Sequence, residues 1–469
     1  MFNRNHNLEN TSIVIIGSGT AAVSAAQSIR KYDKDIEVTL ITDETVMEYS
    51  RCGLPYYISG VVDKFENLVE YSIEWLKNKG IKVMTDCRVK SISPVSQTIY
   101  FDCNNAVNSL HYEKLIIATG SRPKIPHLEG VYKNDGKLIE NIFTLRTNRD
   151  AECIKKIEKG MKVVIVGAGL TGVETAEALS SKGIEVSIVE FFDSVLPSVF
   201  EKDITAELTK NIRNNGIKLY LASAVKEILS NGEMVKGVVV SAAEKEIKMN
   251  ADYVIISAGN KPNSEMAIEA NIKHTESKHI IVDDHMKTDM DNVFAAGDVT
   301  AMYAPYAKGY VAVGTGSIAT RQGLIAGASA IGKDEKFNLP FVNARTTQCF
   351  DVELAAVGAS GFELDNNKVK YITYYYEGDT HPRYMPWNRK VQFKFFLSED
   401  GQLLGAHCSG NKASQRINIL SLAMAKEVNI KELHNMEFAY APAVSPVLDP
   451  MYIALTGLYI KWKRITAYQ

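Results

Sequence analysis

The chain has 469 residues, of which 46% are hydrophobic and 23% are charged, and its formal net charge is −2. This composition is typical of a soluble globular protein, and the length predicts two to four domains because one hydrophobic core rarely serves more than about 300 residues. The near-neutral charge gives no indication of a nucleic-acid or anionic-membrane partner, and no apolar run is long enough to span a bilayer.

The N-terminal segment Met1–Asn10 is polar and contains no signal peptide, so we expect a loose tail and a cytoplasmic protein. The cysteines form no Cys-x-x-Cys or Cys-x-x-x-x-Cys pair and no Cys/His cluster with metal-ligand spacing. We therefore expect a reduced setting and no metal site. The six cysteines are Cys52, Cys87, Cys103, Cys153, Cys349 and Cys408.

A first dinucleotide-binding fingerprint follows the tail. An apolar run predicts a buried strand over Ser12–Ile16, and Val23–Lys31 has the pattern of a helix. The turn between them has the form G-x-G-x-x-A, in which small residues let the backbone approach a pyrophosphate at the helix N-terminus. Its three defining residues are Gly17, Gly19 and Ala22.

The strand after this helix, predicted over Glu37–Ile41, leads to a carboxylate suited to a ribose. Asp43 lies 21 residues after Ala22, where an acid can accept hydrogen bonds from ribose hydroxyls, and Glu44 is a second candidate. Together these features predict a dinucleotide site in the first part of the chain.

The same pattern occurs a second time. Strand Lys162–Val166 is followed by Gly167, Gly169 and Gly172, by a helix, and by a strand over Glu185–Val189. That strand ends at Glu190, 18 residues after Gly172, and two phenylalanines follow it. An acid here favours a free ribose 2′-hydroxyl and repels a 2′-phosphate, so we expect NADH rather than NADPH.

Other predicted strands end in small residues that permit close approach to a cofactor or a second domain. Lys114–Ile117 leads into Ala118 and Gly120, and Tyr253–Ser257 leads into Gly259. A later apolar run ends in Gly297 and Asp298, whose carboxylate can accept hydrogen bonds from a polyol chain; the alternative is an aspartate that caps a helix. An Ala/Gly-rich helix is predicted over Val311–Ile331.

From Phe341 the pattern changes to an α+β unit without a nucleotide fingerprint, which we interpret as a dimerisation domain. We expect antiparallel strands over Val352–Val357, Lys368–Tyr375, Lys390–Phe396 and Leu403–Cys408, and helices over Gln415–Lys426 and Ile430–Glu437.

Cys52 is the candidate catalytic residue. It is a single cysteine on a small-residue turn, Arg51-Cys52-Gly53-Leu54-Pro55, soon after the first fingerprint. The alternative is a small buried hydrophobe, which is the role of most cysteines in a cytosolic protein.

The order of two fingerprints, Ala-Thr-Gly, Gly-Asp and a C-terminal α+β unit resembles the pyridine nucleotide-disulfide oxidoreductases. The resemblance implies an α/β protein with two Rossmann-like dinucleotide-binding domains, for FAD and NADH, and a C-terminal α+β dimerisation domain that makes a homodimer. It predicts an FAD-binding domain in two pieces, 1–127 and 263–338, an NADH-binding domain at 128–262 and a dimerisation domain at 339–469.

The resemblance also implies roles for single residues. Asp298 would hold the ribityl chain of FAD, Arg51 would lie close to FAD, and Glu174 would lie near the nicotinamide and flavin. Tyr440 would donate a proton from one subunit toward the cysteine of the other, and Tyr384 would be a second such tyrosine; packed interface tyrosines are the alternative. Arg30 and Lys31 stand where relatives bind coenzyme A phosphates, or they form a solvated helix end.

Within the family, the sequence around Cys52 resembles the single-cysteine branch, which holds coenzyme A-disulfide reductases, persulfide and polysulfide reductases, and NADH oxidases and peroxidases. Thr20 stands where the peroxidases and oxidases usually carry a histidine, so hydrogen peroxide is not expected as the main acceptor. Leu170 replaces a tyrosine common in relatives, and Arg51 is commoner in relatives that reduce protein partners.

The resemblance predicts an FAD enzyme that passes electrons from NADH to Cys52 and on to a small thiol-derived substrate, such as coenzyme A disulfide, a persulfide or a polysulfide. We expect a Cys52 thiolate whose pKa is lowered by the flavin and by a helix N-terminus. The alternative is a flavoprotein that reduces a protein electron carrier or O₂, with Cys52 not catalytic.

Overall fold

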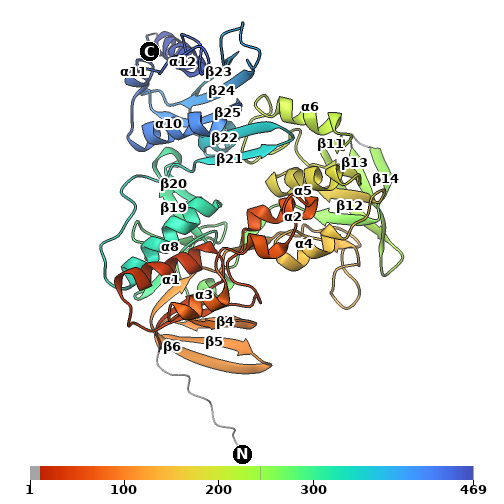
Figure 1. Cartoon of the computed structure of the whole chain (residues 1–469), viewed down its shortest axis with the longest axis vertical. Helices are drawn as coiled ribbons and strands as arrows, with labels where there is room; N and C mark the ends of the chain where they lie inside the picture. Colours follow the sequence, from red (N-terminus) through yellow and green to blue (C-terminus); the bar gives the residue numbers. More distant parts are fainter. Residues whose placement is uncertain (1–10, 243–244, 468–469) are drawn as a thin grey trace, which may run out of the picture.

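The computed structural model describes residues 11–242 and 245–467, so the predicted tail Met1–Asn10 lies outside the described residues. Figure 1 shows three bodies. The lower body combines the start of the chain with a much later segment, the body on the right holds the middle of the chain, and the upper body holds the C-terminal part.

The lower body is organised around a sheet whose parallel half carries the first fingerprint. Its central strands are buried on both faces because helices cover the sheet. Val293–Ala295, from the later segment, pairs in parallel with the end of Ala106–Ile117, and this pairing joins the two segments in one sheet. In spatial order the strands are β3 (Lys82–Met84), β2 (Val38–Ile41), β1 (Thr11–Ile16), β6 (Ala106–Ile117), β5 (Thr98–Cys103) and β4 (Cys87–Ser93), with β18 (Val293–Ala295) paired to β6.

Two helices of this body, α1 (Thr20–Tyr32) and α8 (Gly316–Ala330), pack against each other at very close range. A Cβ atom on Gly323 would lie 2.3 Å from the carbonyl oxygen of Ala21. A Cβ on Gly327 would lie 2.2 Å from the carbonyl oxygen of Ala25. Glycines on α8 therefore let its backbone touch that of α1, which begins at the first fingerprint. The same body holds α3 (Ile73–Asn78), α7 (Glu265–Glu269) and a small sheet of β17 (Ile280–Ile281), β19 (Thr300–Ala304) and β20 (Gly309–Ala312).

The body on the right has a parallel sheet with the second fingerprint at its centre and a separate antiparallel sheet beside it (Figure 1). In spatial order the parallel strands are β11 (Lys218–Tyr220), β10 (Glu185–Val189), β9 (Lys162–Val166), β15 (Tyr253–Ile256) and β8 (Ile142–Phe143). The antiparallel sheet has β12 (Ser223–Ser230), β13 (Val235–Ala242) and β14 (Lys245–Asn250). The helices are α4 (Asn148–Lys155), α5 (Leu170–Ser181) and α6 (Ala206–Asn214), and β7 (Ser121–Pro123) pairs with β16 (Asn260–Pro262) where the two bodies meet.

The upper body is an antiparallel sheet with helices packed on it. Its strands alternate between buried and partly exposed positions, as in Lys390–Leu397, which is the pattern of a sheet with one covered face. In spatial order the strands are β21 (Arg345–Cys349), β22 (Val352–Gly358), β25 (Leu403–Gly410), β24 (Lys390–Leu397) and β23 (Ile372–Asp379). The helices are α9 (Gly361–Asn366), α10 (Ala413–Ala425), α11 (Ile430–Leu433) and α12 (Pro450–Thr466).

The predicted fold class is thus confirmed, but three element predictions were wrong in their bounds. The helix expected from Val311 begins only at Gly316, because Val311 pairs with Met302 in a hairpin. The strand expected over Lys368–Tyr375 is β23, which starts later because Lys368 has a φ of +54° in a turn. The helix expected over Ile430–Glu437 ends at Leu433.

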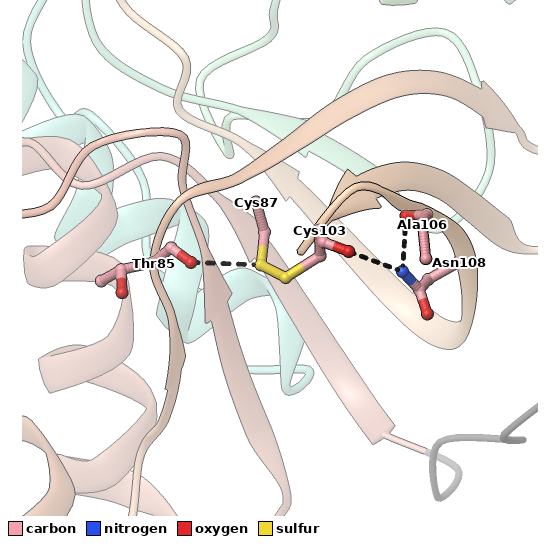
Figure 2. The surroundings of a disulfide bond; sticks show 5 residues. All are labelled: Thr85, Cys87, Cys103, Ala106 and Asn108. Atoms are coloured by element: carbon pink, nitrogen blue, oxygen red, sulfur yellow. Dashed lines mark hydrogen bonds between the residues drawn. A yellow bond between two sulfur atoms is a disulfide. The ribbon is translucent and has the colours of Figure 1, made fainter.

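The expectation of reduced cysteines was also wrong for one pair. Cys87 and Cys103 form a disulfide between strands β4 and β5 (Figure 2). The two residues are far apart in sequence but lie directly opposite each other in the antiparallel register. The remaining cysteines are free: Cys52, Cys153, Cys349 and Cys408.

Candidate functional site

The first fingerprint forms an open turn at the N-terminus of α1. Gly17 has a φ of +136°, and a Cβ atom there would lie 2.2 Å from the carbonyl oxygen of Ala118 at the end of β6. A Cβ on Gly19 would meet no atom within 4 Å, and no side chain caps the helix at this residue. The unpaired N–H groups of the first turn therefore face open space, which fits the pyrophosphate of a dinucleotide.

The second fingerprint repeats this geometry at the N-terminus of α5. Gly167 has a φ of +106°, and Gly169 leaves the helix start uncapped. A Cβ on Gly172 would lie 2.2 Å from the carbonyl oxygen of Gly167, so this glycine lets the helix pack on the turn. Glu190 is buried at the end of β10, and its carboxylate accepts from the Ala168 amide at 2.6 Å and from the Phe192 amide at 2.8 Å. These bonds hold an acid beside the fingerprint turn.

An ion-pair network fixes the segment just before Cys52. Arg51 Nη2 lies 2.5 Å from Glu44 Oε1, and Arg51 Nη1 donates to the hydroxyl of Tyr49 at 2.9 Å. The hydroxyl of Tyr49 in turn donates to Glu44 Oε2 at 3.1 Å. Glu44 is therefore engaged by Arg51, whereas Asp43, the other predicted ribose acid, is exposed beside the end of β2.

Cys52 itself lies in a short 3₁₀ turn, Arg51–Gly53, that runs into α2 (Leu54–Ser59). A Cβ on Gly53 would lie 2.5 Å from Leu68 Cδ2, so the glycine after Cys52 lets the turn pack on the core below it. The buried side chains of α2 share one hydrophobic core with residues of α4, α5 and β21. Cys52 is exposed, and the helix after it packs on elements of the middle and C-terminal bodies.

Charged groups from separate segments act on Cys52. Partial burial of the sulfur and the carboxylates of Glu174 and Asp298 raise the pKa of the Cys52 thiol, and the guanidinium of Arg146 opposes them. The protein groups alone thus raise the pKa of Cys52, and the lowering expected from bound flavin stays a prediction. The helix after Cys52 has only six residues.

Glu174 connects this site to the C-terminal body. Its carboxylate accepts a hydrogen bond from Thr347 Oγ1 on β21 at 3.2 Å. Burial raises the pKa of Glu174 to about 7, with a further contribution from the negative charge of Glu177, while the bond from Thr347 opposes the shift. Near neutral pH this carboxyl can therefore both hold and release a proton.

Asp298 is held beside Arg146 at the point where the later segment returns to the first sheet. Arg146 Nη2 lies 3.6 Å from Asp298 Oδ2, and Ser121 Oγ donates to the same oxygen at 3.2 Å. Gly297 has a φ of +83°, and a Cβ there would lie 3.1 Å from Ala21 Cβ. A Cβ on Gly120 would lie 3.2 Å from Arg146 Nη2, so this glycine makes room for the arginine.

The remaining small-residue ends meet at the junction of the first two bodies. Ala118 is buried, and the loop after it is tied to the segment after Gly259. Thr119 Oγ1 donates to the Asn263 carbonyl at 2.7 Å, and the Asn263 side chain donates back to the Thr119 carbonyl at 2.9 Å. Gly259 has a φ of +99°, and a Cβ there would meet no atom within 4 Å.

Sequence reasoning missed Arg146 and Thr347 as parts of this site. Arg146 precedes a capping box in which Thr147 Oγ1 accepts from the Asp150 amide at 3.2 Å, and that pattern marks a helix start rather than a site. Thr347 lies in an unremarkable polar strand. Nothing in either local pattern indicates that the fold brings it to Cys52 or Glu174.

Two family descriptions match the chain. Residues 11–323 match the pyridine nucleotide-disulphide oxidoreductase family, and residues 345–452 match the dimerisation domain of this family. The chain belongs to the pyridine nucleotide-disulphide oxidoreductases. It is therefore an oxidoreductase that uses FAD and a nicotinamide nucleotide, and the two open fingerprint turns suit these two groups.

Proteins that match nearly the whole chain are named for several different activities. The chain is 32% identical over 447 residues to an NADH oxidase of Methanocaldococcus jannaschii, with 94% of this chain and 97% of the relative covered. It is 27% identical to an NAD(P)H coenzyme A polysulfide/persulfide reductase of Pyrococcus horikoshii, with 94% and 97% covered. The structure of an NAD-dependent persulfide reductase from A. fulgidus superposes with a TM-score of 0.89 at 29% identity, covering 97% of this chain and 84% of that chain.

The resemblance implies that Tyr384 and Tyr440 contact the partner subunit and that Arg30 and Lys31 contact coenzyme A. The structure shows which of these four side chains are exposed and which are engaged within the chain. Tyr384 and Tyr440 are 71% and 49% exposed, both in the C-terminal body. The guanidinium of Arg30 donates to backbone carbonyls, including those of Ile36 and Gly80 at 2.7 Å each, whereas Lys31 is exposed. Arg30 is thus engaged in the fold, and Lys31 is the residue of the pair that faces solvent.

Metal-binding clusters and membrane-spanning helices are both absent from the part of the chain that the structure describes. Within residues 11–242 and 245–467, no group of three or more His, Cys, Asp or Glu side chains could hold a metal ion. In the same ranges, no helix has the length and apolar character needed to cross a lipid bilayer.

Proposed function

We propose that this oxidoreductase passes electrons from NADH, through FAD and Cys52, to a small sulfur substrate. The substrate is a disulfide, persulfide or polysulfide, and coenzyme A disulfide is the specific candidate. The observation that supports this most is the position of Cys52, an exposed thiol on the turn before α2, which shares one hydrophobic core with elements of the middle and C-terminal bodies.

The chemistry is divided between the cofactor and the chain. FAD supplies two-electron exchange between a nicotinamide and a sulfur centre. Cys52 attacks one sulfur of the substrate, forms a mixed disulfide with it and expels the other sulfur as a thiolate. Glu174 takes up the proton that Cys52 loses, because its pKa of about 7 lets it accept a proton near neutral pH.

The same geometry explains how the thiolate is stabilised. A protonated Glu174 no longer carries the charge that raises the pKa of Cys52, and the cation of Arg146 remains nearby. Proton uptake by Glu174 and ionisation of Cys52 therefore favour each other.

We also propose a homodimer in which the dimerisation domain completes the site of the other subunit. Tyr440 of the partner subunit would protonate the leaving thiolate, with Tyr384 of the partner subunit as a second donor. Both side chains are exposed in the single chain and free to reach a second copy. The proposed domain boundaries are 1–127 and 263–338 for FAD, 128–262 for NADH and 339–469 for the dimerisation domain. We further propose that Arg30 and Lys31 bind the phosphates of coenzyme A; Lys31 is exposed, whereas Arg30 is also bonded to backbone carbonyls.

A second candidate acceptor is O₂. The observation that favours it is the 32% identity to a protein named NADH oxidase. The raised pKa of Cys52 agrees with this alternative, because a neutral thiol is a weak nucleophile toward sulfur. A protein electron carrier is the remaining alternative, in which Cys52 has no role.

Substitution of Cys52 by serine tests the proposal, with NADH oxidation measured in the absence of O₂. Wild type should reduce coenzyme A disulfide, a persulfide or a polysulfide, and Cys52→Ser should lose this activity because a hydroxyl cannot form a mixed disulfide. Tyr440→Phe should lose activity by roughly 10²–10⁴-fold, as expected for removal of a general acid.

Two controls separate the candidates. Cys153→Ser, which removes the other exposed free thiol, should keep wild-type rates. Cys52→Ser should still reduce an artificial dye with NADH, which shows that the FAD and NADH sites are intact. The sulfur proposal is wrong if Cys52→Ser keeps its rate on every sulfur substrate. It is also wrong if, in the presence of O₂, wild type and Cys52→Ser consume O₂ equally and faster than any sulfur substrate.

A further inference from the structure

The Cys87–Cys103 disulfide joins β4, the last strand in the spatial order of the first sheet, to its neighbour β5 (Figure 2). Cys87 is buried at the first position of β4, and its Sγ lies 3.2 Å from the carbonyl oxygen of Thr85. Cys103 is the last residue of β5 and is partly exposed. The bond therefore joins a buried residue to a partly exposed one.

The accessible side of the bond lies at a hairpin turn. Asn104 and Asn105, with φ of +52° and +60°, form the two-residue turn after Cys103, and asparagine tolerates this conformation well. The Asn108 side chain donates to the Ala106 carbonyl at 2.8 Å and holds this turn in place (Figure 2). Cys103 lines a hollow of about 530 Å³ whose other walls include Arg88, Asp102, Asn104 and Asn105.

The buried side of the bond is tied to the predicted adenosine end of the FAD site. The Cys87 amide donates to the carbonyl of Thr42 at 2.9 Å, and the Asp86 amide donates to the carbonyl of Glu44 at 3.3 Å. These two carbonyls flank Asp43, the predicted ribose acid. Glu44 also holds Arg51, the residue next to Cys52. The start of β4 thus supports the loop that would hold FAD.

We propose that Cys87–Cys103 is a second thiol–disulfide exchange site, which small thiols open at Cys103, and that opening it weakens the retention of FAD. The physical reason is the hydrogen bonding at residues 42–44, which depends on the position of the first residue of β4. The inference goes beyond the proposed function, because it needs neither Cys52 nor any particular acceptor.

The exchange reaction balances with two small thiols as the reductant. The thiolate of the first attacks Cys103 Sγ, the bond to Cys87 breaks, and Cys87 leaves as a thiolate that takes up a proton. The second small thiol attacks the mixed disulfide on Cys103 and releases Cys103 as a thiol. The two thiols leave as one small disulfide, and the two electrons reside in the thiols of Cys87 and Cys103.

The test measures FAD release from the full-length holoenzyme in a Cys52→Ser background. The protein is equilibrated at fixed ratios of reduced to oxidised glutathione and diluted, and flavin fluorescence reports the dissociation rate. Alkylation followed by mass spectrometry reports the state of Cys87 and Cys103 in the same samples. We expect the release rate to rise about tenfold as the pair opens, which corresponds to ~1.4 kcal/mol.

Two variants serve as controls. Cys87→Ser combined with Cys103→Ser should release FAD rapidly at every glutathione ratio, and Cys153→Ser should follow the parent protein. The Cys52→Ser protein by itself also tests the proposal, without a substitution at Cys87 or Cys103. If the pair opens with no change in release rate, or never forms under excess oxidised glutathione, the proposal is wrong. Neither result bears on turnover of sulfur substrates, which the Cys52 experiment measures.

Discussion

The most direct test of the electrostatics at the site is Glu174→Gln. Glutamine keeps an oxygen that can accept the hydrogen bond from Thr347 Oγ1, which is 3.2 Å long in the wild type. The substitution therefore removes the charge and the proton equilibrium of this side chain while its volume changes little. Any pH-dependent difference between the two proteins then reports on the ionisation of Glu174.

The magnitude follows from the raised pKa. Burial raises the pKa of Glu174 from 4.5 to about 7. At about 1.4 kcal/mol per pH unit, this difference corresponds to roughly 3 kcal/mol at most, because the side chain is only partly buried. Below pH 4.5 Glu174 is protonated in both the folded and the unfolded state, so its raised pKa costs no stability. Between pH 4.5 and about 7 only the folded state holds it, so the wild type loses stability as the pH rises.

We accordingly expect the two proteins to unfold at nearly the same urea concentration at pH 5. By pH 8 Glu174→Gln should be the more stable, by up to roughly 3 kcal/mol in the free energy of unfolding. Glu207→Gln, at an exposed position on α6, controls for the change in net charge. A stability difference that is the same at pH 5 and pH 8, or a wild type that is the more stable at pH 8, would refute the reasoning.

Two further predictions concern the fingerprints and the helix pair. Wild type should show a higher kcat/KM with NADH than with NADPH, and Glu190→Ala combined with Phe191→Arg should shift the preference toward NADPH; a wild type that prefers NADPH would contradict the ribose argument. Gly323→Val should destabilise the protein by about 3 kcal/mol or more and reduce its FAD content, because the Cβ at this position would lie 2.3 Å from the carbonyl oxygen of Ala21. Thermal unfolding measures the loss of stability, and the flavin-to-protein absorbance ratio measures the FAD content. A variant with normal values for both would show that α1 and α8 can separate at little cost.

Local patterns predicted much of the fold because they depend on neighbours in sequence. The strand, glycine-rich turn and helix at Gly17 and again at Gly167 are each defined by fewer than about thirty residues, and the backbone geometry there allows only small side chains. The strands of the second fingerprint, Lys162–Val166 and Glu185–Val189, have the predicted bounds for the same reason. Family membership also followed from the order of these local motifs.

The sequence by itself thus determined the two dinucleotide-binding units, the C-terminal α+β unit and the identity of Cys52 as the candidate thiol. Only the tertiary structure decided what surrounds that thiol. Arg146 and Glu174 come from segments about a hundred residues beyond Cys52, and their charges act on it only because the chain folds back. In the same way, strands β4 and β5 bring Cys87 and Cys103 together, although no spacing rule predicts a bond. Electrostatic and covalent contacts depend on distance in space, which the spacing of residues along a chain does not fix.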